Sequence, residues 1–123
     1  MPSENIIYFG DTSRVPYGNR SRDTILKYAR EDTRFLRTFG PKAIVIACGT
    51  VSSNCLETLQ EESDIPITGV VEPAVHRAAA LTKNRRVGVA ATRATVSSGA
   101  FAPRSICWTS PAASSPRKRE ARR

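Results

Sequence analysis

The chain has 123 residues, which is the size of one domain with a modest hydrophobic core, and its formal net charge of +8 is concentrated in the last 24 residues. Three cysteines without a CxxC pairing favour neither a disulfide framework nor a zinc site, so we expect a reducing, cytoplasmic location. No segment approaches the roughly 20 apolar residues that span a bilayer, and the N-terminus does not look like a signal peptide, which argues against a membrane protein.

The first half of the chain predicts a strand, a helix and a second strand. Residues 5–9, NIIYF, form a short apolar run closed by a Gly-Asp pair, which predicts a buried strand. A helix is expected from Ser21, a capping residue, to the Gly-Pro pair at 40–41, with apolar residues at helical spacing between them. Residues 43–47 are continuously apolar, which predicts a strand buried on both faces of a parallel sheet.

The second half continues the alternation of strands and helices. A helix capped by Ser52 or Ser53 is expected first, followed by a strand over 65–71. Pro66 must lie at the start of that strand or at an edge of the sheet. A helix from Pro73 to about Thr82, a strand over 86–91 and a helix entry over 92–98 complete the expected elements. This order, with short connections, predicts an α/β domain with a doubly wound parallel sheet.

The chain changes character at about Ala102. Residues 102–123 contain three of the eight prolines and six of the 19 basic residues, without apolar periodicity. We therefore expect an α/β domain over residues 1–101 and a disordered, solvated basic tail over residues 102–123. Nucleic-acid binding by this tail is an alternative function, but it is disfavoured, because Trp108 alone is a thin basis for base stacking.

Cys48 follows the second apolar run and precedes a stretch rich in hydroxyl side chains. Ligand sites of open parallel sheets lie beyond the carboxyl ends of the strands, next to helix N-termini. A helix N-terminus lowers the pKa of a thiol from about 8.5, and the thiol then serves as a base or nucleophile. Alternatively, Cys48 is a small apolar residue at the end of a strand, because free cysteines are often buried. The residues alone leave both interpretations open.

Other chemistries have less support in the sequence. A Cys-x5-Arg phosphate loop would need arginine at position 54, where this chain has Asn54. His76, the only histidine, is expected on the surface of a helix, and Cys55 is expected to pack inside one. No glycine-rich nucleotide loop is present, and we expect neither a cofactor nor a metal.

A second polar loop is expected at the same edge of the sheet as Cys48. Residues 10–21 follow the first expected strand and place Tyr17 and Gly18 on a turn at Pro16. The stretches IIYFGDTSRVPYGNRS, AIVIACGTVSS, IPITGVVEPA and VGVAATRATVSSGAF resemble, in order and spacing, the first part of bacterial glutamate racemase, a member of the aspartate/glutamate racemase superfamily. The resemblance covers residues 2–101.

The resemblance implies a cofactor-independent, often homodimeric enzyme that interconverts L- and D-glutamate for peptidoglycan synthesis. It implies two catalytic cysteines on opposite faces of the substrate α-carbon, and Cys48 matches the first of them. Glu72 and Thr92 lie in family motifs near the site. Gly49 stands where the family usually has Asn, so the resemblance does not extend to one side-chain contact. The implied substrate-binding residues are Tyr17, Gly18, Gly49 and Thr50.

The sequence departs from the family at both ends. The Asp-Ser-Gly strand that opens the family is not present, and residues 102–123 lack the Cys-Thr-His motif of the second catalytic thiol. We therefore expect a truncated racemase, and we hypothesise that its tail is read in a shifted frame. In a flavodoxin-like strand order the absent strand would lie between two that remain, so we expect marginal stability and little activity. Aspartate racemisation by a related enzyme is a further alternative.

Overall fold

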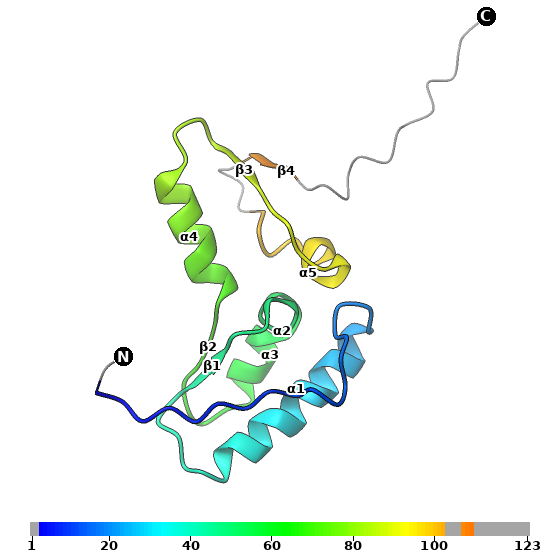
Figure 1. Cartoon of the computed structure of the whole chain (residues 1–123), viewed down its shortest axis with the longest axis vertical. Coiled ribbons are helices and arrows are strands. Elements are labelled where there is room, and N and C mark those ends of the chain that lie inside the picture. The colour runs from blue at the N-terminus through cyan, green and yellow to red at the C-terminus, as the bar shows by residue number, and fades with distance from the viewer. Residues whose placement is uncertain (1–2, 103–106, 110–123) are drawn as a thin grey trace, which may run out of the picture.

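The computed structural model describes residues 3–102 and 107–109 and is a mixed α/β fold with parallel strands (Figure 1). Among these residues no helix is both long enough and apolar enough to cross a membrane. The elements in chain order are α1 (Arg22–Arg37), β1 (Ile44–Ile46), α2 (Gly49–Asn54), α3 (Leu56–Glu61), β2 (Ile67–Gly69), α4 (Val71–Leu81), β3 (Arg86–Gly88), α5 (Arg93–Ser97) and β4 (Cys107–Thr109).

The strands form two separate parallel pairs, β1 with β2 and β3 with β4. In the first pair Ile44 lies opposite Ile67 and Ile46 opposite Gly69. Pro66 lies just before β2, as expected of a residue without an N–H group, and its carbonyl accepts a hydrogen bond from the Ile44 N–H at 2.9 Å. The parallel sheet is therefore present but incomplete among the described residues.

The long helix α1 forms where its sequence signals predict. The Ser21 side chain accepts a hydrogen bond from the Thr24 N–H and caps the first turn, and Asp23 lies in that turn, where a negative charge is favourable. The chain leaves the helix through Gly40, whose φ of 62° is the left-handed conformation that glycine adopts most readily. The buried face of α1 carries Ile25, Leu26 and Ala29.

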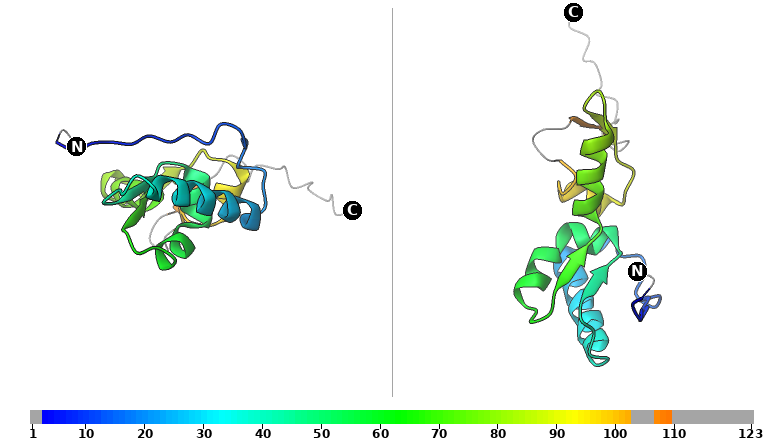
Figure 2. Two further views of the ribbon diagram at one scale, coloured as in Figure 1. Left: turned by 90° about the horizontal axis from the view of Figure 1, so that it is seen from below. Right: turned by 90° about the vertical axis from the view of Figure 1, so that its left-hand side faces the viewer.

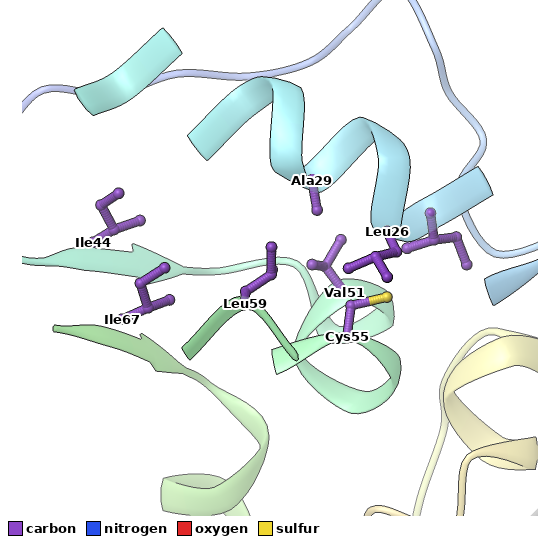
Figure 3. Close-up of a cluster of buried hydrophobic side chains, with 8 residues drawn as sticks. Leu26, Ala29, Ile44, Val51, Cys55, Leu59 and Ile67 are labelled. Carbon is purple, nitrogen blue, oxygen red and sulfur yellow. The ribbon is translucent and has the colours of Figure 1, made fainter. Parts of the chain in front are cut away.

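The hydrophobic core lies between α1, the β1–β2 pair and the two short helices α2 and α3, as Figure 3 shows. Apolar burial of this kind contributes about 25 cal/mol per Å² and is the main stabilising term for such a fold. Strand β3 contributes no residue to this cluster. Its members are Ile25, Leu26, Ala29, Ile44, Val51, Cys55, Leu59 and Ile67.

Two expectations for strands are wrong. Residues 5–9 form no strand, and β1 is buried on one face only, because Val45 is exposed. A strand needs a hydrogen-bonded neighbour, and no described strand lies beside residues 5–9. The helices that form the core pack on the face of β1 that carries Ile44, and no core residue covers Val45.

The helix after Cys48 begins earlier than expected. Its first residue is Gly49, with Cys48 at the N-cap position, whereas Ser52 or Ser53 was the expected cap. The Ser52 hydroxyl instead donates to the Ile46 carbonyl at 2.8 Å, and the Ser53 hydroxyl donates to the Thr50 carbonyl at 3.2 Å. Both serines are therefore engaged inside the helix, and Thr50 falls in its first turn.

The C-terminal region is described only in part. Residues 107–109 form β4, which runs parallel to β3, so the expectation of no regular structure beyond residue 102 does not hold for this segment. Residues 103–106 and 110–123, which carry most of the expected basic tail, lie outside the described residues. Figure 2 shows α4, β3, α5 and β4 together on one side of the molecule. Of these, α5 packs Ala94 against the core cluster.

Candidate functional site

Cys48 lies between the carboxyl end of β1 and the first turn of α2. Its thiol is free and exposed, and its side chain forms no capping hydrogen bond. The interpretation of Cys48 as a small buried residue is therefore wrong. Its carbonyl accepts the first hydrogen bond of α2, from the Ser52 N–H at 2.9 Å, so the backbone that carries the thiol is held by the helix.

Three threonines connect this helix to the loop that follows β3. The Thr50 and Thr92 hydroxyl oxygens are 3.0 Å apart, and those of Thr92 and Thr95 are also 3.0 Å apart. Thr50 and Thr95 are buried, and Thr92 caps α5 by accepting a hydrogen bond from the Thr95 N–H. The cluster joins α2 to α5, and it brings the expected site residue Thr50 together with Thr92. Sequence reasoning missed Thr95, although its position three residues after the cap was a usable signal.

Gly18 lies against the same threonine cluster. A Cβ atom added to Gly18 would be 2.7 Å from Cβ of Thr92 and 2.8 Å from its methyl carbon, which is closer than real contacts allow. Thr92 therefore touches both Gly18 and Thr50, so two of the expected substrate-binding residues meet through a third residue. Gly49 is different, because a Cβ atom there would meet nothing within 4 Å. Gly49 therefore borders open space.

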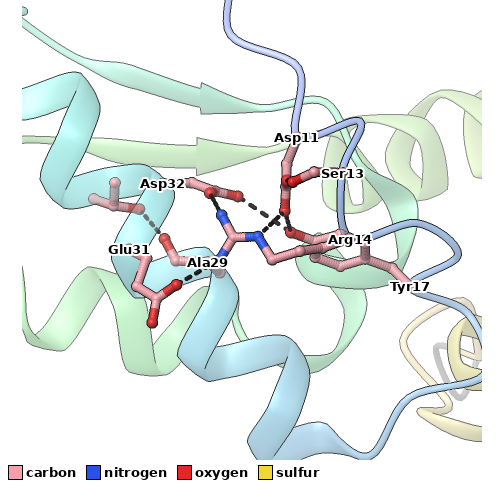
Figure 4. Close-up of polar contacts among 8 residues, drawn as sticks. Asp11, Ser13, Arg14, Tyr17, Ala29, Glu31 and Asp32 are labelled. Atoms are coloured by element: carbon pink, nitrogen blue, oxygen red, sulfur yellow. Dashed lines mark hydrogen bonds and ion pairs between the residues drawn. The ribbon is translucent and has the colours of Figure 1, made fainter.

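Tyr17 belongs to the same loop but is held by a separate polar network (Figure 4). Its hydroxyl donates hydrogen bonds to the carboxylates of Asp11 and Asp32, the latter at 3.2 Å. Its ring packs edge-on against Tyr28 of α1, with centroids 5.8 Å apart. The network thus fixes the side chain of Tyr17 on α1, next to the Gly18 backbone.

Arg14 is the centre of this network. Its guanidinium contacts Asp11 at 2.7 Å, Asp32 at 2.5 Å and Glu31 at 2.5 Å. It also lies over the ring of Tyr28, 4.7 Å from the centroid, which is a cation–π geometry. Three carboxylates and one arginine together clamp the loop over residues 10–21 onto α1. Sequence reasoning missed this clamp, because nothing in the spacing of residues 14 and 32 indicates contact.

The protonation states in the clamp follow from burial and from these partners. Burial, and then the hydrogen bond to Asp11, raises the pKa of Tyr17, so its hydroxyl remains a donor. Burial alone would raise the pKa of the Asp11 carboxyl. Hydrogen bonds from Tyr17 and Arg14 have the larger, opposite effect, so the pKa of Asp11 lies below its usual value. Burial raises the pKa of Asp32 despite the neighbouring Arg14.

The remaining candidate residues lie away from this cluster. Cys55 is buried in the core, and burial raises the pKa of its thiol, so the expected packing role is confirmed. His76 and Glu72 are exposed on α4, with Nε2 of His76 3.6 Å from Oε1 of Glu72. This confirms the surface position expected for the histidine. In the part of the chain that the structure describes, no group of histidine, cysteine or acidic residues is arranged to hold a metal.

Comparisons with known proteins identify the family. A model of the Asp/Glu/Hydantoin racemase family matches residues 1–105. A glutamate racemase from Persephonella marina is 48% identical over 101 residues, which are 82% of this chain and 39% of that relative. A glutamate racemase from Chlorobium phaeobacteroides is 50% identical over 103 residues, 83% of this chain and 38% of that relative. The chain thus spans about two fifths of the length of these relatives.

Solved structures lead to the same family. A glutamate racemase from Aquifex pyrophilus superposes with a TM-score of 0.80 at 42% identity, covering 86% of this chain and 44% of that chain. A glutamate racemase from Francisella tularensis, in complex with D-glutamate, has a TM-score of 0.78 at 40% identity, covering 89% and 43% of the two chains. The chain described here therefore belongs to the Asp/Glu/Hydantoin racemase family.

Proposed function

We propose that this chain provides a proton-transferring face of a cofactor-independent glutamate racemase, with Cys48 as the base. The relatives named glutamate racemase and the D-glutamate complex of the Francisella tularensis enzyme support glutamate as the substrate. The product, D-glutamate, would serve peptidoglycan synthesis in the cytoplasm, and the free thiols of Cys48 and Cys55 fit a reducing compartment.

The observation that carries the proposal is the free, exposed thiol of Cys48 at the carboxyl end of β1, directly before the threonine cluster. The α-proton of an amino acid is weakly acidic, so its removal requires a base held close to it and donors that stabilise the developing negative charge. In the proposed step the Cys48 thiolate takes the α-proton, and the electron pair of the broken C–H bond moves toward the substrate carboxylate.

Backbone N–H groups are the available donors for that carboxylate. The hydroxyls of Tyr17 and Thr50 already contact Asp11 and Thr92. By contrast, the N–H groups of Tyr17 and Gly18 have no hydrogen-bond acceptor among the described residues. The first-turn N–H groups of α2, at Gly49 and Thr50, also have no partner within the helix. We propose that these groups, rather than the hydroxyls, bind the substrate carboxylates.

Among the side chains that the structure describes, Cys48 carries the one accessible thiol, and this limits the proposed chemistry. Inversion needs a proton donor on the opposite face of the α-carbon, and the other described thiol, that of Cys55, is buried in the core. We therefore expect Cys48 to return a proton to the face from which it was taken. In heavy water the chain should exchange the α-proton of one enantiomer of glutamate for deuterium while racemising it slowly.

The test is proton NMR of D- and L-glutamate incubated separately with the chain in heavy water. Exchange that is confined to one enantiomer and lost in Cys48→Ser is the expected result. Exchange that persists in Cys48→Ser would overturn the assignment of the base. Racemisation at an ordinary enzymatic rate would overturn the proposal that Cys48 removes and returns the proton on one face of the α-carbon. The same assay with aspartate, the other amino acid in the family description, tests the alternative substrate.

A further inference from the structure

The loop over residues 10–21 is held in place by side chains more than by its own backbone. Among the described residues, its backbone forms one internal hydrogen bond near each end. The Thr12 N–H donates to the Gly10 carbonyl and the Arg20 N–H donates to the Tyr17 carbonyl, each at 3.0 Å. Between these two bonds, the backbone forms none with another backbone group of the described chain. The course of the loop therefore depends on side-chain contacts.

Arg14 binds both of the carboxylates that hold Tyr17. The Tyr17 hydroxyl donates to Asp11 and to Asp32. Nε of Arg14 lies 2.7 Å from Asp11, and its Nη2 lies 2.5 Å from Asp32 (Figure 4). The Asp11 side chain is only 9% exposed, so solvent screens its contact with the guanidinium weakly. Tyr17, and with it the adjoining Gly18, is thus fixed on α1 through the partners of Arg14.

Without Arg14 the carboxylates of this clamp would repel one another. Asp11, Glu31 and Asp32 each contact a different nitrogen of the guanidinium. No other lysine or arginine within the described residues forms an ion pair with any of the three. Converging like charges oppose one another, so the clamp needs a cation at its centre. A lysine carries the same charge on a single nitrogen and cannot reproduce a planar contact with three carboxylates.

We propose that Arg14 is a positioning residue, which sets the affinity of the site for substrate by holding the N–H groups of Tyr17 and Gly18 in place. The inference rests on the proposed function, in which those N–H groups bind a substrate carboxylate. A loop that adopts its binding geometry for only a fraction of the time weakens the apparent affinity by that fraction. Loss of Arg14 should therefore weaken glutamate binding. It should not change the reactivity of the Cys48 thiol, which is held separately at the start of α2.

The first arm of the test compares Arg14→Gln with a matched control, Arg30→Gln. Arg30 lies on α1 and binds Glu62 through two nitrogens at 2.8 and 2.5 Å, without a hydrogen bond or ion pair to the loop. Iodoacetamide labelling of Cys48 at increasing glutamate concentrations gives the concentration for half protection. Arg14→Gln should raise it roughly tenfold, as expected if the loop is in place in about a tenth of the molecules. The control should leave it unchanged, and labelling without glutamate should be equal in all three proteins.

The labelling experiment also shows whether each variant is folded. Cys55 is buried in the core, so its labelling stays slow as long as the core is intact. If Arg14→Gln labels rapidly at Cys55, Arg14→Lys takes its place. That variant keeps the positive charge but loses the planar contact, so it should raise the half-protection concentration by a smaller factor.

The second arm follows the position of the loop without glutamate, by chymotrypsin cleavage after tyrosine. Tyr17 is half-buried against Tyr28, whereas Tyr8 is 89% exposed and serves as the reference in the same protein. Cleavage after Tyr17, relative to cleavage after Tyr8, should rise several-fold in Arg14→Gln and stay unchanged in Arg30→Gln, because a released loop is an easier substrate. Equal relative cleavage in all three proteins would overturn the claim that Arg14 fixes the loop.

The two arms separate this inference from the proposed function. If glutamate protects the unchanged chain and Arg14→Gln at the same concentration, the proposed function stands and the role of Arg14 is overturned. If both arginine variants weaken protection equally, the effect is a general loss of stability, and the inference is again overturned. If glutamate does not protect Cys48 even in the unchanged chain, the proposed function fails and the role of Arg14 in affinity fails with it. Chymotrypsin cleavage then still shows whether Arg14 orders the loop.

Discussion

Gly18 and Gly49 lie at the same candidate site but in opposite surroundings. The backbone of Gly18 is pressed against Thr92, whereas Gly49 faces open space at the start of α2. The first glycine is therefore required by packing. The second leaves room that a larger side chain would fill.

This contrast predicts different costs for the same substitution. Gly18→Ala should lower the free energy of unfolding by about 1 to 3 kcal/mol, the usual cost of overpacking, because the added methyl meets Thr92. Gly49→Ala is the matched control, and its unfolding free energy should be close to that of the unchanged chain. Urea denaturation of the three proteins gives the comparison. Equal stabilities of the two variants would show that the contact between Gly18 and Thr92 does not constrain the loop.

Tyr17 predicts a specific dependence of stability on alkaline pH. Its pKa is raised above the ordinary value of about 10 by burial and by the hydrogen bond to Asp11, so the folded protein holds this proton more tightly than the unfolded chain. The resulting stabilisation is complete below about pH 10 and falls as the pH rises toward the folded-state pKa. Tyr17→Phe should therefore lose less stability than the unchanged chain between about pH 9 and 11.

Thermal melts across that pH range check this prediction. Tyr8→Phe, which alters an exposed tyrosine of the N-terminal segment, is the matched control and should keep the pH dependence of the unchanged chain. If the melting temperatures of Tyr17→Phe and Tyr8→Phe fall equally between about pH 9 and 11, the Tyr17 hydroxyl does not make the stabilising hydrogen bond to Asp11.

At the scale of elements, the short helix α5 depends on one residue for both its cap and its docking. The Thr92 hydroxyl accepts from the Thr95 N–H and also contacts the Thr50 hydroxyl of α2. Thr92→Ala should therefore destabilise the fold by about 1 to 2 kcal/mol, at the upper end of the usual loss for an N-cap. Thr92→Ser keeps the hydroxyl and should retain most of the stability. Chemical denaturation distinguishes them, and equal losses would mean that the methyl group, not the hydroxyl, matters.

The elements differ in how well local sequence predicts them. Helices α1 and α5 begin after Ser21 and Thr92 as expected, because capping is a local interaction. The start of α2 was missed because the Ser52 hydroxyl binds the carbonyl of Ile46 instead of capping the helix. The apolar run over residues 5–9 predicts a strand, but strand formation depends on a neighbour that local sequence does not specify.

The candidate site shows the same division between local and long-range signals. Local patterns place Cys48, Tyr17 and Thr50 in polar stretches that follow expected strands, whereas the substrate-binding set of Tyr17, Gly18, Gly49 and Thr50 comes from the resemblance to glutamate racemase. The Arg14 clamp joins residues that are 17 and 18 positions apart, and neither helical periodicity nor turn chemistry predicts such a pairing.

At the scale of the whole molecule, the core is confined to one part of the chain. The buried cluster draws on α1, β1, α2, α3 and β2, whereas α4 and β3 together contribute one buried residue, Val71. Local unfolding is easier where fewer side chains are buried, so α4 and β3 should unfold locally more readily than the elements that form the core.

Hydrogen exchange measures this difference directly. We expect the amides of α1 to be protected many-fold more strongly than those of α4, because the buried face of α1 packs in the core while α4 is largely exposed. Mass spectrometry of peptic fragments resolves the two helices. Equal protection of α1 and α4 would mean that the molecule unfolds as a single cooperative unit.

The measurement that tests the central claim most directly is the rate of alkylation of each cysteine, with and without glutamate. Iodoacetamide should label exposed Cys48 rapidly and buried Cys55 slowly, as read by mass spectrometry of the separate peptides. Glutamate should slow the labelling of Cys48 alone, and lactate, which lacks the amine and the side-chain carboxylate, should not. Labelling of Cys48 that is indifferent to glutamate would contradict the account of a glutamate site at the carboxyl end of β1.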